Sequence, residues 1–229
     1  RSQLGRLSTR NLVRSGSVVL QHKRIHSVLM FQRMNSVTEL SDGRRLRSER
    51  SRKAMIDAAL ALIEEGNYAP TAKQISSRAG VGIRSFFRQF EDMDLFFSAL
   101  DEQTVGSFWD SFLREGQREG PLDQRLDSIV ATYGEAFEKH RSLLLATKSL
   151  RWSSSVLKAN YQRYQKISRS NKESWIPEIT ELGSDERELV DAYLSFEMWH
   201  RLRDIQGLSC ETAQAAIVKA CGGLLFSRG

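Results

Sequence analysis

Cysteine and proline are scarce in the 229-residue sequence, and both shortages restrict the class of protein. Two cysteines, Cys210 and Cys221, are too few for a disulfide framework or a four-cysteine zinc site, and they suit a reducing cytosol. Three prolines and 15 glycines are too few for a loop-rich all-β protein or a low-complexity chain. Because no run of about 18 apolar residues occurs, the sequence predicts no transmembrane helix and no membrane partner.

Signatures of catalysis and of bound metals are missing as well. The sequence has no glycine-rich phosphate loop, no serine nucleophile elbow and no zinc-spaced set of cysteines and histidines. Glu197 and His200 have the spacing used in di-iron bundles, but such a site needs a second pair of this kind, which the sequence lacks. The sequence therefore predicts a protein that is not an enzyme and that needs no metal and no cofactor.

The charged residues are unevenly distributed along the chain. Residues 1–90 contain 17 basic and 6 acidic side chains, whereas residues 91–229 contain 17 and 22. An excess of basic residues in the N-terminal part of a chain is typical of a segment that binds a polyanion such as nucleic acid. It suggests that the rest of the chain has a different role.

The first 43 residues differ in composition from the rest. No acidic residue precedes Glu39, and the short apolar clusters follow no sustained helical period. We expect residues 1–43 to be a basic, disordered arm, with an arginine-rich transit peptide as the weaker alternative. Met30 and Met34 lie shortly before the first predicted helix and suit a start of translation. A further alternative is therefore that residues 1–33 are an upstream extension of the reading frame.

From residue 48 onward, apolar residues recur with the period of an α-helix almost throughout. No segment convincingly predicts a strand, so we expect an all-α protein with about nine helices. The expected helices span residues 48–65, 72–79, 83–89, 92–115, 121–139, 142–152, 154–174, 184–206 and 210–226.

The second and third of these helices have the spacing of a helix-turn-helix unit. A tight turn that contains Gly80 joins residues 72–79 to residues 83–89, and in such units the second helix enters the major groove of DNA. An ordinary helical hairpin has similar spacing, but Arg84 and Arg88 lie four residues apart on this second helix. Residues 44–90 hold 10 basic and 4 acidic side chains, which favours contact with phosphates. The basic flank before the first helix consists of Arg44, Arg45, Arg47, Arg50, Arg52 and Lys53.

The same segment resembles the DNA-binding domain of TetR-family transcriptional regulators. The resemblance rests on Arg52-Lys53-Ala54-Met55-Ile56-Asp57-Ala58-Ala59-Leu60, then Gly66, Thr71, Ile75, Ala79-Gly80-Val81 and Phe86-Phe87-Arg88-Gln89-Phe90. It implies a three-helix DNA-binding domain over residues 44–91 and a larger helical bundle over residues 92–229 for ligand binding and dimerisation. It also implies a cytoplasmic homodimer that represses transcription from a palindromic operator in double-stranded DNA and that a small apolar or amphipathic molecule releases.

Several positions depart from the usual family pattern, namely Gly82, Arg84, Ser85, Phe87, Gln89 and Met93. We expect DNA binding to survive with an unusual operator, because Ser85 keeps a hydroxyl and Arg84 can read guanine. The alternative is a small-molecule-binding helical protein whose specific DNA binding is weakened or lost, and Phe87 and Met93 favour it. The residues predicted to contact DNA are Arg50, Arg52, Thr71, Gly82, Ile83, Arg84, Ser85, Phe87 and Arg88.

The remainder of the chain is rich in aromatic residues, which in a helical bundle can line an apolar pocket. For any single residue, ordinary core packing is the better explanation. The predicted ligand-binding residues are Trp109, Phe112, Tyr133, Phe137, Trp152, Tyr161, Trp175, Phe196 and Trp199. The last helix is rich in alanine and glycine, so the last two helices are expected to form a four-helix interface in the dimer, with intramolecular packing as the alternative.

Overall fold

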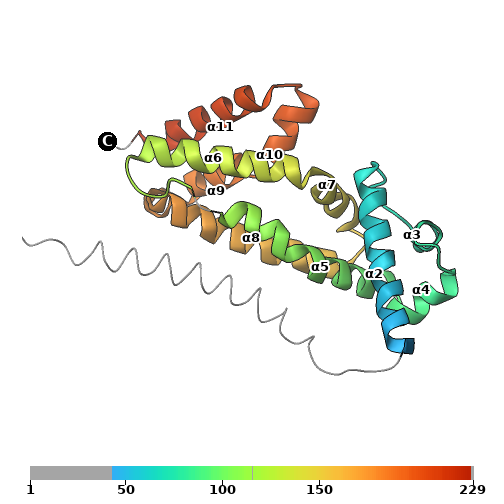
Figure 1. The fold of residues 1–229 in the computed structure, drawn as a ribbon. Coiled ribbons are helices and arrows are strands. Elements are labelled where there is room, and N and C mark those ends of the chain that lie inside the picture. Colours follow the sequence, from blue (N-terminus) through green and yellow to red (C-terminus); the bar gives the residue numbers. More distant parts are fainter. Residues whose placement is uncertain (1–42, 115, 228–229) are drawn as a thin grey trace, which may run out of the picture. The chain divides into compact units, whose positions relative to one another are not determined.

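The computed structural model describes residues 43–114 and 116–227, and all regular structure in these two ranges is helical (Figure 1). The expected all-α fold is therefore confirmed. The arm expected over residues 1–43 lies outside the described residues, apart from the start of the first helix. The α-helices are α2 (Gly43–Glu64), α3 (Ala72–Arg78), α4 (Ile83–Phe90), α5 (Met93–Leu113), α6 (Leu122–Lys139), α7 (Arg141–Leu150), α8 (Ser155–Trp175), α9 (Ser184–Tyr193), α10 (Phe196–His200) and α11 (Cys210–Leu225).

The helix expected over residues 184–206 is wrong as a single element. The structure breaks it between α9 and α10, and α10 then runs into a π-helical turn at Arg201–Ile205. The break occurs at Ser195, whose hydroxyl accepts a hydrogen bond from the Met198 N–H at 3.2 Å and so caps a new helix. Because buried residues continue at helical spacing on both sides of Ser195, the apolar pattern conceals the break.

Two smaller differences also have local causes. The first helix begins at Gly43 rather than near residue 48. Apolar periodicity does not predict these additional turns, because they carry no apolar stripe. A short 3-10 helix at Pro177–Glu181 was not expected, and it begins at a proline that has no N–H to donate. The remaining helix ends lie within about two residues of the expected positions.

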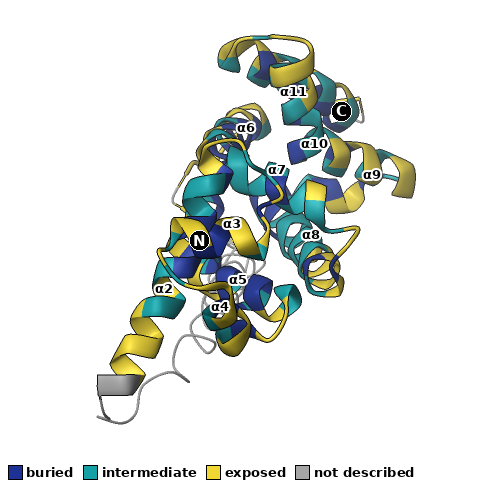
Figure 2. Cartoon of the chain, turned by 90° about the vertical axis from the view of Figure 1, so that its right-hand side faces the viewer, coloured by how far each residue is buried: buried dark blue, intermediate teal, exposed yellow. Residues whose placement is uncertain are grey.

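The first apolar core lies beneath the two short helices. Phe86 and Phe90 of α4 are buried against Phe96 of α5, with ring centroids 5.2 Å and 5.0 Å from that ring. Figure 2 shows this buried layer where α2, α3, α4 and α5 meet. The core extends beyond the boundary expected at residue 91, because it also includes Leu157 from α8. The domains expected over residues 44–91 and 92–229 therefore share apolar contacts.

A second core is built around α6, which contacts α5, α8 and α11. Tyr133 and Ile129 of α6 are fully buried there, together with Trp109 of α5. A close approach is possible at Gly134, where the Trp199 ring occupies the space that a side chain would fill. The indole N–H of Trp199 donates to Glu138 at 3.0 Å, which fixes the ring against α6.

Gly134→Ala should lower the free energy of unfolding by about 1 to 3 kcal/mol. A Cβ atom at this position would lie 2.6 Å from Cη2 of Trp199, so the indole must move and its bond to Glu138 must stretch. Urea unfolding followed by far-ultraviolet circular dichroism measures the change. The matched control is Gly106→Ala, where a Cβ meets no atom within 4 Å and the variant should gain about 0.5 to 1 kcal/mol. Equal stabilities for the two variants would contradict this account.

Candidate functional site

The outward face of α4 carries most of the predicted DNA-contacting residues. Arg84 and Arg88 are exposed, and 48% of Phe87 and 41% of Ile83 are accessible. The half-buried Ser85 lies between them, and its hydroxyl accepts a hydrogen bond from Arg88 Nη2 at 3.3 Å. Burial of the opposite face of α4 in the first core therefore brings these side chains together on the surface.

The orientation of α4 relative to α3 is set by a short turn. Gly80 has a φ of +66°, a left-handed conformation that residues with a side chain rarely adopt. The Val81 N–H donates to the Ser76 carbonyl at 3.0 Å, which closes the turn. Gly82 then begins α4 in extended conformation, and no side chain caps the helix. The first N–H groups of α4 are therefore available to an external acceptor.

Thr71 begins α3 as part of a capping box. Its hydroxyl accepts from the Gln74 N–H at 3.3 Å, and the Gln74 side chain accepts from the Thr71 N–H at 2.9 Å. Thr71 is exposed beside Lys73, a cation on the same helix that the sequence reasoning missed. No periodic or capping signal distinguishes Lys73, because its position becomes informative only once α3 has been placed beside α4.

The basic flank on α2 divides into two groups. Arg50 is exposed, as expected for a residue that contacts a phosphate. Arg52 is half-buried, with its guanidinium 4.9 Å above the Phe90 ring and Nη2 at 4.0 Å from Glu102. Arg52 therefore contacts both α4 and α5, while 41% of its side chain stays accessible.

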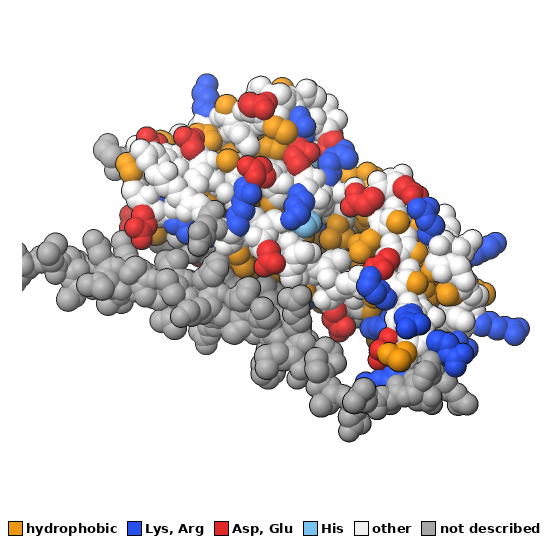
Figure 3. All heavy atoms as spheres, viewed as in Figure 1, with side chains coloured by type: hydrophobic (Ala, Val, Ile, Leu, Met, Phe, Trp, Pro, Cys, Tyr) orange, Lys and Arg blue, Asp and Glu red, His pale blue; other side chains and the backbone are white. Residues whose placement is uncertain are grey.

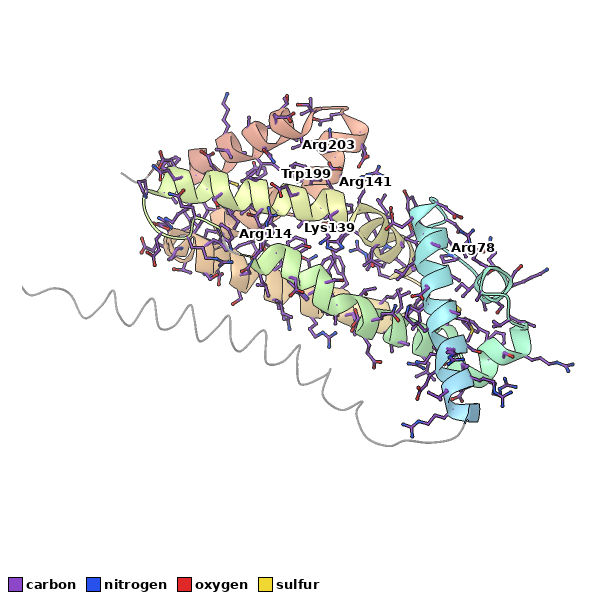
Figure 4. All side chains as sticks on the ribbon, in the orientation of Figure 1. Arg78, Arg114, Lys139, Arg141, Trp199 and Arg203 are labelled. Carbon is purple, nitrogen blue, oxygen red and sulfur yellow. The ribbon has the colours of Figure 1, made fainter. Side chains whose placement is uncertain are left out.

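Two other cations of this region are engaged within the fold. Lys53 donates to Asp57 at 2.6 Å, and the Arg78 guanidinium (Figure 4) forms two hydrogen bonds to Glu65. Figure 3 shows Lys and Arg side chains gathered over the part of the molecule that holds α2, α3 and α4. The positive surface of this region therefore includes exposed cations from all three helices, namely Arg84 and Arg88 of α4, Lys73 of α3 and the arginines in the first turns of α2.

A carboxylate joins the beginning of α5 to the beginning of α8. Asp94 accepts hydrogen bonds from the hydroxyls of Ser154 at 2.5 Å and Ser155 at 2.7 Å. These bonds hold the pKa of Asp94 below its usual value, and N–H groups of residues 155 and 156 act in the same direction. Because α5 follows α4 after two residues, this contact fixes the end of α4 relative to α8. Asp94 carries no signal in the sequence, because its partners lie about sixty residues away.

Most of the predicted ligand-binding residues lie in the interior. Trp152 differs, because 77% of it is accessible, so its predicted place in an interior pocket is wrong; it follows the C-terminus of α7. Tyr161 is half-buried and donates to Glu197 at 3.0 Å beneath the Arg151 guanidinium. The buried candidates are Trp109, Phe112, Tyr133, Phe137, Trp175, Phe196 and Trp199.

The buried aromatic side chains pack against each other in edge and tilted arrangements. Phe112 lies 5.1 Å from Tyr133 and 5.8 Å from Trp109 between ring centroids. Among the described residues, the indole N–H groups of Trp109 and Trp175 are buried and have no hydrogen-bond partner. Since an unsatisfied buried donor costs free energy, these two groups mark places where a ligand acceptor would be stabilising.

An open groove on the body is lined mainly by charged rather than apolar residues. It has a volume of about 380 Å³ and lies between α5 and α6, and Arg114 and Lys139 on its sides are labelled in Figure 4. A second, smaller cavity of about 10 Å³ borders the ion pair between Lys172 and Asp191, whose charged atoms are 2.8 Å apart. Burial lowers the pKa of Lys172, and this cavity has room for about one water molecule.

Within the described ranges, no three His, Cys, Asp or Glu side chains are grouped so that they could hold a metal ion. No helix in these ranges is both long enough and apolar enough to cross a membrane.

Comparison with known proteins identifies the N-terminal region. Residues 55–100 match the sequence model of a family described as bacterial regulatory proteins, tetR family. The match runs from α2 through α3 and α4 into α5, and so contains every buried residue of the first core except Leu157, together with the exposed face above it. The resemblance drawn from the sequence is confirmed over this segment. No curated protein matches the chain.

Asp94→Asn should lower the free energy of unfolding at neutral pH by about 1 kcal/mol, because the two serine hydroxyls lose a charged acceptor. The folded-state pKa of Asp94 is lowered, so its contribution is present above the unfolded pKa of about 3.9 and is lost as the pH falls through the folded value. The difference between variant and wild type should therefore shrink in acid. Urea unfolding at neutral and acidic pH measures it, with Asp127→Asn on the exposed face of α6 as control. A difference that does not depend on pH would refute the assignment.

Proposed function

We propose that this chain, which carries the DNA-binding domain of the tetR family at residues 55–100, is a ligand-responsive transcriptional repressor. It acts in the cytoplasm as a homodimer on a palindromic operator in double-stranded DNA. The observation that carries the proposal is the division of α4 into two faces. Phe86 and Phe90 anchor the helix, and this anchoring leaves Arg84, Phe87 and Arg88 free to enter a groove.

The roles of the individual side chains follow from their chemistry. Arg84 is suited to donate two hydrogen bonds to a guanine edge, and Phe87 to contact a thymine methyl group. Ser85 and Arg88 lie on the same face and suit a phosphate or a base edge. Gly82 and Ile83 supply backbone N–H groups at the start of α4, where an anion is favoured.

Thr71 and Arg50 complete the surface from the two neighbouring helices. Both are exposed, and both suit contacts to the DNA backbone that position the protein without reading sequence. Arg52 connects α2 to α4 through Phe90 and to α5 through Glu102, and its half-exposed side chain also suits a contact to the DNA backbone.

The dimer is proposed to form through the C-terminal helices. The exposed apolar residues there include Leu189 of α9, Ile205 of the π-helical turn with 65% of its surface accessible, and Phe226 after α11. Ala215 and Gly223 on the exposed side of α11 permit close approach of a second helix. A two-fold axis through these helices would present two copies of α4 to half-sites about 34 to 36 Å apart.

The effector is proposed to be a small apolar or amphipathic molecule that enters the aromatic interior of the body. The buried indole N–H of Trp109 supplies a donor for an acceptor atom on this molecule. The protein must have one conformation that fits the operator and one that does not. The molecule can release DNA only if it binds the second conformation more tightly than the first. The Asp94 contact supplies a mechanical route, because it connects α8 of the body to the end of α4.

A second candidate function is a ligand-binding helical protein with weakened specific DNA binding. Phe87 lacks the phenol that would bond a phosphate. Met93 is uncharged and therefore places no positive charge over the DNA backbone. It is half-buried and packs against the first core.

Arg84→Ala should reduce affinity for an operator selected from a random duplex library by about 1 to 3 kcal/mol. The variant should lose sequence discrimination at only one or two base pairs of this operator. Fluorescence anisotropy on single-base variants of the operator measures this. The control is Lys158→Ala, an exposed cation on α8. An equal loss at every base pair would indicate a phosphate contact. Failure of the wild type to enrich any sequence would favour the second candidate, and sedimentation of the same sample tests the dimer.

Addition of an apolar effector should weaken operator binding at least about tenfold, within the usual range of allosteric coupling. A panel of apolar and amphipathic compounds is screened against the protein–operator complex by anisotropy. Trp109→Phe, which removes the N–H and keeps an aromatic ring, should reduce the response to the active compound while leaving operator affinity without effector unchanged. If no compound changes operator affinity, the release mechanism fails although DNA binding stands.

A further inference from the structure

The first two turns of α2 extend beyond the packed part of the helix. Every residue from 45 to 50 is exposed, whereas the first buried side chain of α2 is Met55. Figure 2 shows this end of α2 as an exposed helical segment. We call residues 45–50 the basic turn, because three arginines and one glutamate stand among its six residues. Arg45 and Glu49 form an exposed ion pair at 3.2 Å, which is worth little in water.

One side chain of α4 holds the basic turn. Gln89 Nε2 donates to the Ser48 carbonyl at 3.2 Å and approaches the Ser48 hydroxyl at 2.6 Å. These two contacts connect residues 41 positions apart in the sequence. Gln89 follows Arg88, so the basic turn is fastened directly beside the face of α4 that is proposed to enter the groove.

We propose that Gln89 is a positioning residue that orients the basic turn as a second DNA-contacting surface, aimed at the phosphates that flank the groove occupied by α4. This inference rests on the proposed DNA-binding function and adds a surface to it. The partner is double-stranded DNA, because the basic turn is continuous with the exposed face of α4 and because its arginines carry the charge that phosphates attract.

The physical reason for a positioning residue is the cost of ordering a helix end. The basic turn buries no apolar side chain, so packing does not fix its direction and the terminal turns of a helix readily fray. A side-chain amide that bonds both the carbonyl and the hydroxyl of Ser48 restricts this freedom before DNA arrives. Preorganisation of this kind strengthens binding because less conformational entropy is lost on association.

The test measures the dependence of duplex affinity on salt for the full-length protein. The probe is a fluorescein-labelled, mixed-sequence duplex of about 30 base pairs titrated in about 50 to 200 mM KCl. The variants are Gln89→Leu, which keeps the size of the side chain and removes the donor, Arg50→Ala, and the two combined. Lys158→Ala is the matched loss of an exposed charge outside α2, α3 and α4, and circular dichroism with thermal unfolding verifies that each variant is folded.

Arg50→Ala should reduce the slope of log K against log salt by about 1, the contribution of about one phosphate contact. Gln89→Leu should reduce it by about 1 to 2, although it removes no charge. In the Gln89→Leu background, Arg50→Ala should change the slope by less than half as much as it does alone. A purely structural role would leave the slope unchanged, so slope and coupling together identify positioning.

Two results would overturn the inference. One is a wild-type slope in a folded Gln89→Leu variant, and the other is an equal effect of Arg50→Ala in both backgrounds. Failure of the proposed function itself gives a different pattern, in which wild-type protein binds the duplex without salt dependence and Arg84→Ala has no effect. If Arg84→Ala weakens operator binding while Gln89→Leu leaves the slope unchanged, the function stands and only the positioning role falls.

Discussion

The arrangement of the candidate site depends on the burial of one face of an eight-residue helix. A helix this short is unstable alone in water, so α4 persists because Phe86 and Phe90 are packed against Phe96. The same packing decides which residues face outward, since the helical period then places Arg84 and Arg88 on the opposite side. The contact of Phe86 and Phe90 with Phe96 therefore both stabilises α4 and decides which of its residues are exposed.

That contact also links α4 to the body of the protein. Leu157 of α8 belongs to the same apolar core, and Asp94 bonds the first residues of α8 from the first turn of α5. The domain boundary expected between residues 91 and 92 was predicted from the sequence pattern. It does not separate two independent apolar cores. Side chains in contact therefore connect the beginning of α8 to the end of α4.

The body combines a dense aromatic interior with charged surface features. Phe112 and Phe137 contact neighbouring rings and leave little open space between them, whereas the groove between α5 and α6 is lined mainly by charged residues. An apolar effector would therefore have to displace packed side chains on entering, and the unsatisfied indole of Trp109 is a point where its arrival would recover a hydrogen bond.

The sequence alone determined the all-α class, nearly all helix ends and the spacing of the helix-turn-helix, because these depend on local periodicity, capping and glycine placement. Only the tertiary structure decided that Arg52 lies over the Phe90 ring, that Trp152 is exposed and that Ser195 divides the helix expected over residues 184–206. It also paired Gln89 with Ser48 and Asp94 with Ser154. Such pairs join residues far apart in the chain, and a single sequence carries no period or motif that records which distant partner a polar side chain will meet.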